Sequence, residues 1–211
     1  MKLVCFAVKE EASAFQKLAA HKPGVAILVT GMGRQNAATA LRDFLTVCPA
    51  ELVLTCGFAG GLDPALPPGA VVFATDDDEL GENLLAAGAK RARFHCADRV
   101  AVTAMEKQQL RTATGADAVE MESEAVQTVC REHALPCATV RVISDSAGED
   151  LPLDFNQLYR PDMTLDYVKL AWAVLQAPGK IGALMKLQQR CRFAATQLAG
   201  VLMKVVAQEE N

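Results

Sequence analysis

The sequence is poor in aromatic and histidine residues. Phe, Trp and Tyr make up 5% of the 211 residues, whereas hydrophobic residues of all kinds make up 51%. A core with this composition is mainly aliphatic, and so large an apolar fraction excludes a disordered chain. The three histidines (His21, His95 and His133) share no spacing typical of metal ligands, so we expect no metal site.

Long hydrophobic runs and paired cysteines are also lacking. The seven cysteines are an odd number without CxxC spacing, which indicates reduced thiols and a cytosolic protein. The opening residues MKLVCFAVKEE contain too short an apolar run for a signal peptide. No run of 18 apolar residues occurs, so the sequence predicts no membrane-spanning helix.

Positive charge is scarce over most of the chain. The formal net charge of −4 argues against nucleic acid as the main partner. From Met163 onward the balance reverses, with six basic and three acidic side chains. A chain of 211 residues is long enough for one domain with a full core, and we assign residues 1–211 to one domain.

Short apolar runs alternate with helical patterns. Continuous runs of Val, Leu and Ile suit strands that are covered on both faces of a sheet. This alternation predicts an α/β fold: a three-layer α/β/α domain with a mostly parallel or mixed sheet. The expected strands are 3–8, 25–30, 51–57, 69–75 and 137–144, and the expected helices are 11–20, 34–47, 104–113 and 123–133. Glycine-rich turns are expected at 31–33, 57–61 and 67–69, and the acids at 76–79 are expected to form a solvated loop.

The last fifty residues have a different pattern. Apolar residues recur at spacings of three and four between Leu184 and Val205, which is typical of one apolar helix face. Another helix is expected over 165–176, and APGK at 177–180 separates the two. The sequence therefore predicts a helical hairpin, as an extension over 155–207 that packs on the domain.

Carboxylates and glycine turns follow the expected strands, where open α/β sheets bind their ligands. Glu11 follows the first strand, Asp145 the last, and Glu120 and Glu122 precede a helix. Alone, each has an ordinary explanation: a helix cap for Asp145, surface acids at a helix start for the glutamates, and simple turns for the glycines. Their common placement at one sheet edge favours an enzyme site.

Six motifs in order resemble one family. AVKEE, VTGMG, CGFAGGL, PPGAVV, AVEMES and RVISDSA follow the signature of the methylthioadenosine/S-adenosylhomocysteine nucleosidases and their phosphorylase relatives, over about residues 1–147. The resemblance implies the fold of that superfamily and cleavage of a purine nucleoside. The specific part is VEMES followed by RVISD, because the glycine turns are generic.

The resemblance also implies residue roles. Glu11 matches the glutamate that activates water, and Asp145 matches the aspartate that protonates N7 of the purine. Arg141 matches an arginine near the nucleophile. Where the family has a purine-stacking aromatic, this chain has Arg99 or Val100. The binding residues implied are Glu122 for the ribose hydroxyls, Met121 under the sugar, and Glu120, Gly33, Phe58, Ala59, Gly60, Val100 and Ala147.

The implied reaction needs these residue types. Breaking an N-glycosidic bond leaves positive charge on the sugar and negative charge on the purine, and an acid at N7 typically gives 10²–10⁴-fold acceleration. Asp145 must then be protonated and Glu11 ionised in one site. A carboxylate near the sugar favours its positive charge.

Hydrolysis and phosphorolysis are both open, and hydrolysis is favoured. Phosphorylases tend to place arginine and serine where this chain has Thr55 and Phe58, although Arg34 lies at a helix start that suits an anion. We therefore expect no cofactor, with phosphate as a co-substrate only if the protein is a phosphorylase.

The tail suggests a substrate. FNQLYRPDMTLDYVKLAWAVLQAPGKIGALMKL (155–187) resembles the C-terminus of the hopanoid-associated nucleosidase/phosphorylase subfamily, and the insertion that closes the 5′ side in related nucleosidases is nearly gone. The resemblance implies adenosylhopane, a lipid-tailed nucleoside, as first guess, and peripheral membrane contact through the basic apolar hairpin. Other readings are futalosine, methylthioadenosine or 5′-deoxyadenosine as substrate, a homodimer interface on the hairpin, and a nucleoside-binding protein without turnover.

Overall fold

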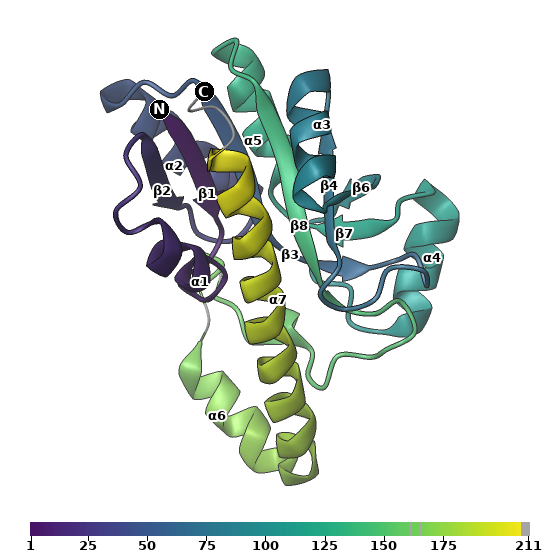
Figure 1. Ribbon diagram of the computed structural model, residues 1–211. Helices are drawn as coiled ribbons and strands as arrows, with labels where there is room; N and C mark the ends of the chain where they lie inside the picture. Colours follow the sequence, from purple (N-terminus) through teal and green to yellow (C-terminus); the bar gives the residue numbers. More distant parts are fainter. Residues whose placement is uncertain (161, 165, 208–211) are drawn as a thin grey trace.

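The central sheet has eight strands in the computed structural model, which describes residues 1–160, 162–164 and 166–207. Its main path joins strands that are distant in sequence (Figure 1). The antiparallel pairs are β4 with β8 and β7 with β3, so the sheet is mixed. Along the path lie β2 (Val25–Val29), β1 (Lys2–Phe6), β3 (Leu52–Gly61), β8 (Cys137–Asp145), β4 (Val71–Thr75) and β5 (Lys90–Arg91), while β7 (Ala118–Glu120) pairs with β3 and with β6 (Phe94–Cys96).

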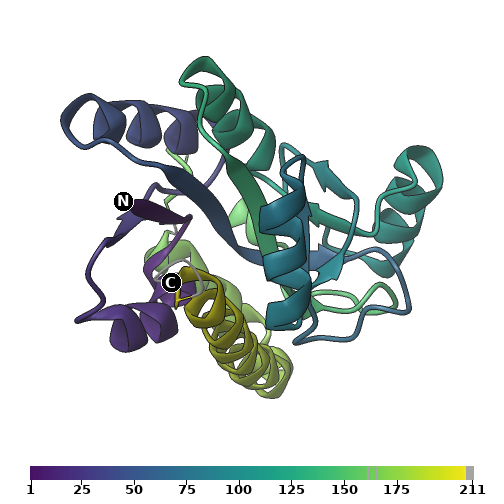
Figure 2. The ribbon, with the colours of Figure 1, turned by 45° about the horizontal axis from the view of Figure 1, so that its top comes forward.

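Helices cover both faces of this sheet (Figures 1 and 2). The larger core cluster joins one face to α1 (Lys9–Ala19), α3 (Asp78–Ala87) and the second half of α7 (Ile181–Ala207). The second cluster joins the other face to α2 (Arg34–Val47) and α5 (Ser123–Glu132). At the far end of the sheet, α4 (Ala104–Thr114) follows β6. The expected three-layer α/β/α fold is confirmed.

Strand β1 shows why the apolar runs are continuous. Leu3 and Cys5 pack toward α2 and α5, whereas Val4 and Phe6 pack toward α1 and α7. Successive side chains of a strand point to opposite faces, so a strand covered on both sides needs apolar residues at every position.

Two expected loops are wrong. The glycines at 57–61 continue β3, because β8 pairs with it as far as Gly60 and β7 pairs with Gly60 and Gly61. The acidic run at 76–79 leads into α3: the side chain of Asp77 accepts the N–H of Leu80 at 2.9 Å, and Asp78 and Glu79 lie in the first turn. Carboxylates at a helix start satisfy free N–H groups and interact favourably with the helix dipole.

The C-terminal hairpin consists of α6 (Tyr167–Gln176) and α7, with the short 3₁₀ helices η1 (Phe155–Gln157) before them and η2 (Pro178–Lys180) between them. Leu165, at the expected start of the first helix, lies outside the described residues. Packing on the core is confined to α7 from Ala194 onward, while α6 has no buried residue and extends away from the sheet (Figure 1). Among the described helices, none is long and apolar enough to cross a bilayer.

Candidate active site

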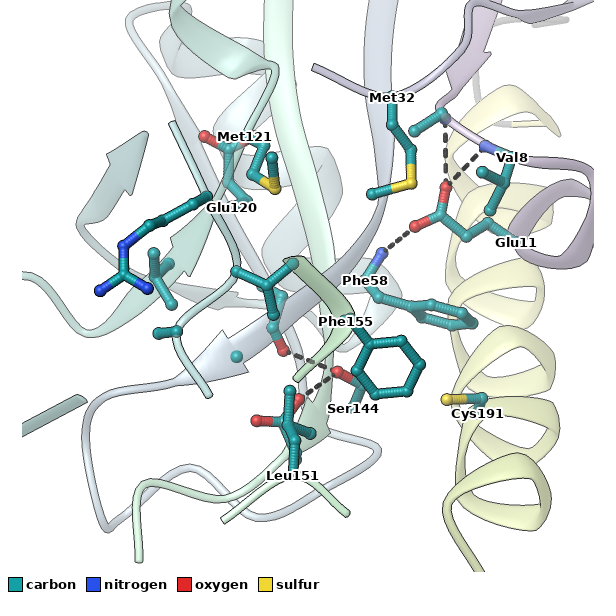
Figure 3. Close-up of a pocket in the computed structure, with 18 of the residues that line it drawn as sticks. Val8, Glu11, Met32, Phe58, Glu120, Met121, Ser144, Leu151, Phe155 and Cys191 are labelled. Carbon is teal, nitrogen blue, oxygen red and sulfur yellow. Dashed lines mark hydrogen bonds between the residues drawn. The ribbon is translucent and has the colours of Figure 1, made fainter. Parts of the chain in front are cut away.

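A cavity of about 230 Å³ opens at the carboxyl ends of β1, β3 and β8 (Figure 3). The loop after β2, the 97–102 segment, the end of β7, the η1 segment and α7 complete its walls. Side chains from distant parts of the sequence therefore meet around one space, as expected at this edge of an α/β sheet. The lining residues are Ala7, Val8, Glu11, Met32, Phe58, Ala59, Gly60, Arg99, Val100, Ala101, Val119, Glu120, Met121, Glu122, Ser144, Asp145, Leu151, Phe155, Tyr159, Leu187 and Cys191.

Glu11 is held by backbone amides on both sides of its carboxylate. Oε2 accepts the N–H groups of Ala7 at 3.1 Å and Val8 at 3.2 Å, and Oε1 accepts the N–H of Phe58 at 2.8 Å (Figure 3). Burial and the nearby charge of Glu122 raise the pKa of Glu11 to about 7, although the amide of Phe58 opposes the rise. A carboxyl with this pKa is suited to take a proton near neutral pH.

Arg141 lies behind the cavity and is paired with two glutamates. Its Nη2 donates to Glu120 Oε2 at 2.7 Å and to Glu122 Oε2 at 3.4 Å. Burial tends to raise the pKa of Glu120, but Arg141 and the hydroxyl of Ser123 hold it below its usual value. Burial raises the pKa of Glu122, and Arg141 offsets only part of that rise. Glu120 is therefore a fixed anion, whereas Glu122 faces the cavity with its charge less completely compensated.

Gly33 connects Glu122 to the loop after β2. The N–H of Gly33 donates to Glu122 Oε1 at 2.9 Å. Its φ of +85° lies in the left-handed region that favours glycine. This glycine therefore orients Glu122 from outside, and it is not among the cavity-lining residues.

Asp145 is the last residue of β8 and is buried at the cavity wall. Its Oδ1 accepts the hydroxyl of Ser144 at 2.6 Å, and its Oδ2 accepts Lys107 Nζ at 2.5 Å. Lys107, on α4, is completely buried and is absent from the lining set. No motif or spacing in the sequence singles out this lysine. The proposed acid is therefore paired with a buried cation.

Two aromatic residues that the sequence reading missed also line the cavity. Phe155 and Tyr159 come from the segment after β8. Asn156 pins this segment to the 97–102 loop, since its Nδ2 donates to Val100 O and its Oδ1 accepts the N–H of Val100, both at 2.9 Å. An aromatic face therefore stands beside Val100, although the 97–102 segment itself carries none.

The structure brings most of the expected site residues together. Nine of them line the cavity, while Gly33, Arg141 and Ala147 do not: Glu11, Phe58, Ala59, Gly60, Val100, Glu120, Met121, Glu122 and Asp145. Arg141 and Gly33 act on the cavity through Glu122. Ala147 lies in the turn between Ser146 and Glu149, whose carbonyls both accept Lys107 Nζ, and it is not among the lining residues.

The sequence matches one protein family over most of its length. A profile of the phosphorylase superfamily matches residues 8–87 and 85–164. The chain belongs to the phosphorylase superfamily. The resemblance found in the motifs is therefore confirmed at the level of the family, and so is the expectation of an enzyme.

Curated relatives carry nucleosidase names. The chain is 29% identical over 168 residues to a 5′-methylthioadenosine/S-adenosylhomocysteine nucleosidase of Bacillus subtilis, covering 63% of this chain and 73% of the relative. A relative of the same name from Glaesserella parasuis is 27% identical over 167 residues, with the same coverage.

Solved structures share the fold. The futalosine hydrolase of Helicobacter pylori superposes with a TM-score of 0.74 at 17% identity, covering 98% of this chain and 97% of that one. A nucleosidase of the same organism, bound to butyl-thio-DADMe-Immucillin-A, gives the same values. At this identity the likeness shows a common fold, with the C-terminal helix included.

Proposed function

We propose that this protein cleaves the N-glycosidic bond of a 5′-modified purine nucleoside with water as the nucleophile. The observation that carries the proposal is the meeting of Glu11, Glu122 and Asp145 in one cavity. Asp145 serves the departing base, Glu11 takes a proton from water, and Glu122 binds the ribose. The nucleosidase names of the relatives support the same reaction.

The charges around the cavity favour a purine nucleoside. Breaking the bond leaves a sugar with oxocarbenium character, and the carboxylates of Glu11 and Glu122 favour this positive charge. The ring of Phe155 offers an apolar surface for the base, together with Val100. Met121 provides an apolar contact for the sugar. The site is thus polar toward the reacting bond and apolar toward the flat faces of the substrate.

Water is favoured over phosphate by the same charges. The lining residues include the carboxylates of Glu11, Glu120, Glu122 and Asp145, against the single cation Arg99. Arg141 compensates Glu120 and part of the charge of Glu122, and Lys107 pairs with Asp145. The remaining negative charge lies on Glu11 and Glu122, where a phosphate dianion would be repelled. One observation favours the phosphorylase alternative: Nε and Nη1 of Arg141 are buried without a hydrogen-bond partner among the described residues. Because Glu120 and Glu122 already compensate this guanidinium, we expect those groups to serve a water molecule.

The α7 wall supports a large apolar 5′ substituent. Leu187 and Cys191 line the cavity, and the same helix continues into the exposed part of the hairpin. Adenosylhopane is the first substrate we propose, because its triterpenoid tail could follow this path. Large apolar side chains are exposed along the hairpin: Tyr167, Val168, Trp172, Leu175, Ile181, Met185 and Phe193.

Substrate panels test the reaction. Purified protein is incubated with adenosylhopane, futalosine, methylthioadenosine and 5′-deoxyadenosine, with and without phosphate, and free base and sugar products are quantified. We expect base and free ribose product without phosphate. Strict phosphate dependence would establish a phosphorylase instead. Binding without any release of base by the wild type would establish the non-catalytic alternative.

Asp145→Asn tests the assignment of the acid. Asparagine keeps the size of the side chain but cannot supply a proton, so we expect base release to fall roughly 10²–10⁴-fold. Unchanged release would show that Asp145 does not serve the leaving base.

The hairpin surface carries the proposed membrane contact. The hairpin that exposes these apolar residues also carries five basic side chains: Lys169 on α6, Lys180 on η2, and Lys186, Arg190 and Arg192 on α7. A basic, apolar surface suits anionic lipid headgroups. We expect the protein to sediment with vesicles that contain anionic lipid, and less so in high salt. The hairpin surface is alternatively covered by a second copy of the chain in a homodimer, and size-exclusion chromatography with light scattering tests this by measuring the molar mass.

A further inference from the structure

Lys107 is a charged residue in an unexpected place. Helix α4 is predominantly polar, yet Lys107 is its buried residue, with no exposed surface. Lysine is almost never fully buried without a partner. A buried cation in a small domain is costly, so its position calls for a structural or functional reason.

Three oxygen atoms surround its ammonium group. Nζ donates to Asp145 Oδ2 at 2.5 Å, and to the carbonyls of Ser146 and Glu149 at 2.9 Å each. An ammonium group has three donor hydrogens, and each one has an acceptor here. This geometry fits a protonated lysine facing an ionised Asp145.

Asp145 separates this lysine from the substrate space. Asp145 lines the cavity, whereas Lys107 is not among its lining residues. The hydroxyl of Ser144 holds the other carboxylate oxygen at 2.6 Å. A proton on Lys107 can therefore reach a purine in the cavity only by way of Asp145.

We propose that Lys107 is a positioning residue that stores the proton delivered to the leaving purine and passes it through Asp145. The inference rests on the proposed function and deepens it. An ionised Asp145 has no proton of its own to give, but the Lys107–Asp145 pair has one. The pair can thus supply an acid at a pH where an isolated carboxyl group would be fully ionised.

The proton and electron balance is complete. The C1′–N9 bond breaks with its electron pair on the purine, and N7 takes a proton from Asp145 as Asp145 takes one from Lys107. Water forms the new C1′–O bond and loses a proton to Glu11. After the products leave, the proton on Glu11 passes to solvent and Lys107 is protonated again. One water is consumed for each nucleoside cleaved.

Lys107→Met tests this role with two leaving groups. The first substrate is the nucleoside of the panel that the wild type cleaves fastest. The second is a 4-nitrophenyl riboside, whose phenolate leaves without protonation. If the wild type does not cleave this riboside, 6-chloropurine riboside takes its place, because 6-chloropurine is a better leaving group than adenine. The ratio of variant to wild-type kcat/KM is followed from pH 6 to pH 9. Arg111→Met, which removes another basic side chain of α4, paired with Asp63, is the matched control.

For the purine nucleoside we expect a ratio of roughly 10⁻² at pH 9 that rises as the pH falls toward 6, because protons from solvent then replace the one that Lys107 supplies. With the 4-nitrophenyl riboside the ratio should stay within about threefold of one. With 6-chloropurine riboside, if it is used instead, the ratio should be well above that for the first substrate. Arg111→Met should leave the activity on both substrates unchanged. If Lys107 had only a structural role, Lys107→Met would lower kcat/KM for both substrates equally at every pH. That result would overturn the inference, and so would an unchanged kcat/KM for the purine nucleoside.

If Lys107→Met does not fold, a double variant tests the same inference. Asp145→Asn with Lys107→Met leaves no unpaired charge in this pair. If Lys107 acts through Asp145, adding Lys107→Met to Asp145→Asn changes purine release by less than about twofold. A further large loss in the double variant would overturn the inference. If the wild type releases no base from any substrate, the proposed function itself fails, which is a separate result.

Discussion

Replacing Gly57 with alanine tests how Glu11 is held. A Cβ at this position would lie 2.7 Å from Glu11 Oε1 and 2.9 Å from its Cδ, closer than real Cβ contacts. The φ of Gly57 is +154°, in a range that residues with a side chain rarely adopt. The substitution must therefore move the carboxylate, strain the backbone, or do both.

The magnitude follows from these two effects. A strained backbone residue costs roughly 1–3 kcal/mol. Losing the N–H of Phe58 from a charged acceptor costs about 1.5–3 kcal/mol more. Because each kcal/mol shifts Tm by roughly 2–4 °C in a protein of this size, we expect Tm to fall by roughly 5–20 °C. Displacement of the base should lower kcat roughly 10²–10⁴-fold.

Thermal unfolding and base release measure the two effects. The control is Gly200→Ala on α7, where an added Cβ meets no heavy atom within 4 Å, so activity should be kept and Tm should not fall, because alanine favours a helix more than glycine does. Wild-type kcat and wild-type Tm in Gly57→Ala would refute the reasoning, because the carboxylate would then tolerate the methyl group where it lies.

Three other predictions concern the same site. Since the pKa of Glu11 is raised to about 7 and its ionised form is the base, kcat/KM should fall roughly tenfold per pH unit below about pH 7, and a flat profile down to pH 5 would exclude Glu11 as the base. Arg141→Met leaves Glu120 and Glu122 without their buried cation, so urea unfolding should show a loss of about 3–5 kcal/mol; a loss below 1 kcal/mol would contradict the pairing. Phe155→Ala should weaken binding of the purine by about 1–3 kcal/mol, seen as a higher KM with little change in Tm; an unchanged KM would show that the base lies elsewhere.

Much of the fold could be predicted from the pattern of apolar residues in the sequence. Strands covered on both faces must be apolar throughout, which is why β1, β3 and β8 were recognisable. The error at 57–61 has a physical cause: glycine is typical of turns, but here β8 and β7 pair with those residues, and sheet pairing is a long-range property. Asp77 and its acidic neighbours cap α3, but a run of acidic residues is equally typical of a solvated loop, so the charge pattern alone did not distinguish the two.

Only the site residues that belong to sequence motifs were predictable. Glu11, Glu122 and Asp145 follow strands and lie in motifs that resemble those of the nucleosidase family. Lys107 stands in a polar helix, where a lysine ordinarily faces solvent, and its burial depends on the turn after β8. Phe155 lies ten residues beyond Asp145 in η1, a 3₁₀ helix of three residues, which is too short for a periodic pattern to point to the cavity.

Helix α7 has a mechanical consequence. Its 27 residues span roughly 40 Å at 1.5 Å per residue. The end from Ala194 onward is clamped in the core, Leu187 and Cys191 form part of the cavity wall, and the first turns stand free. Because α7 is held in the core at one end and lines the cavity near its middle, a load on its free end, whether from a lipid layer or from another protein, would tilt the cavity wall formed by Leu187 and Cys191.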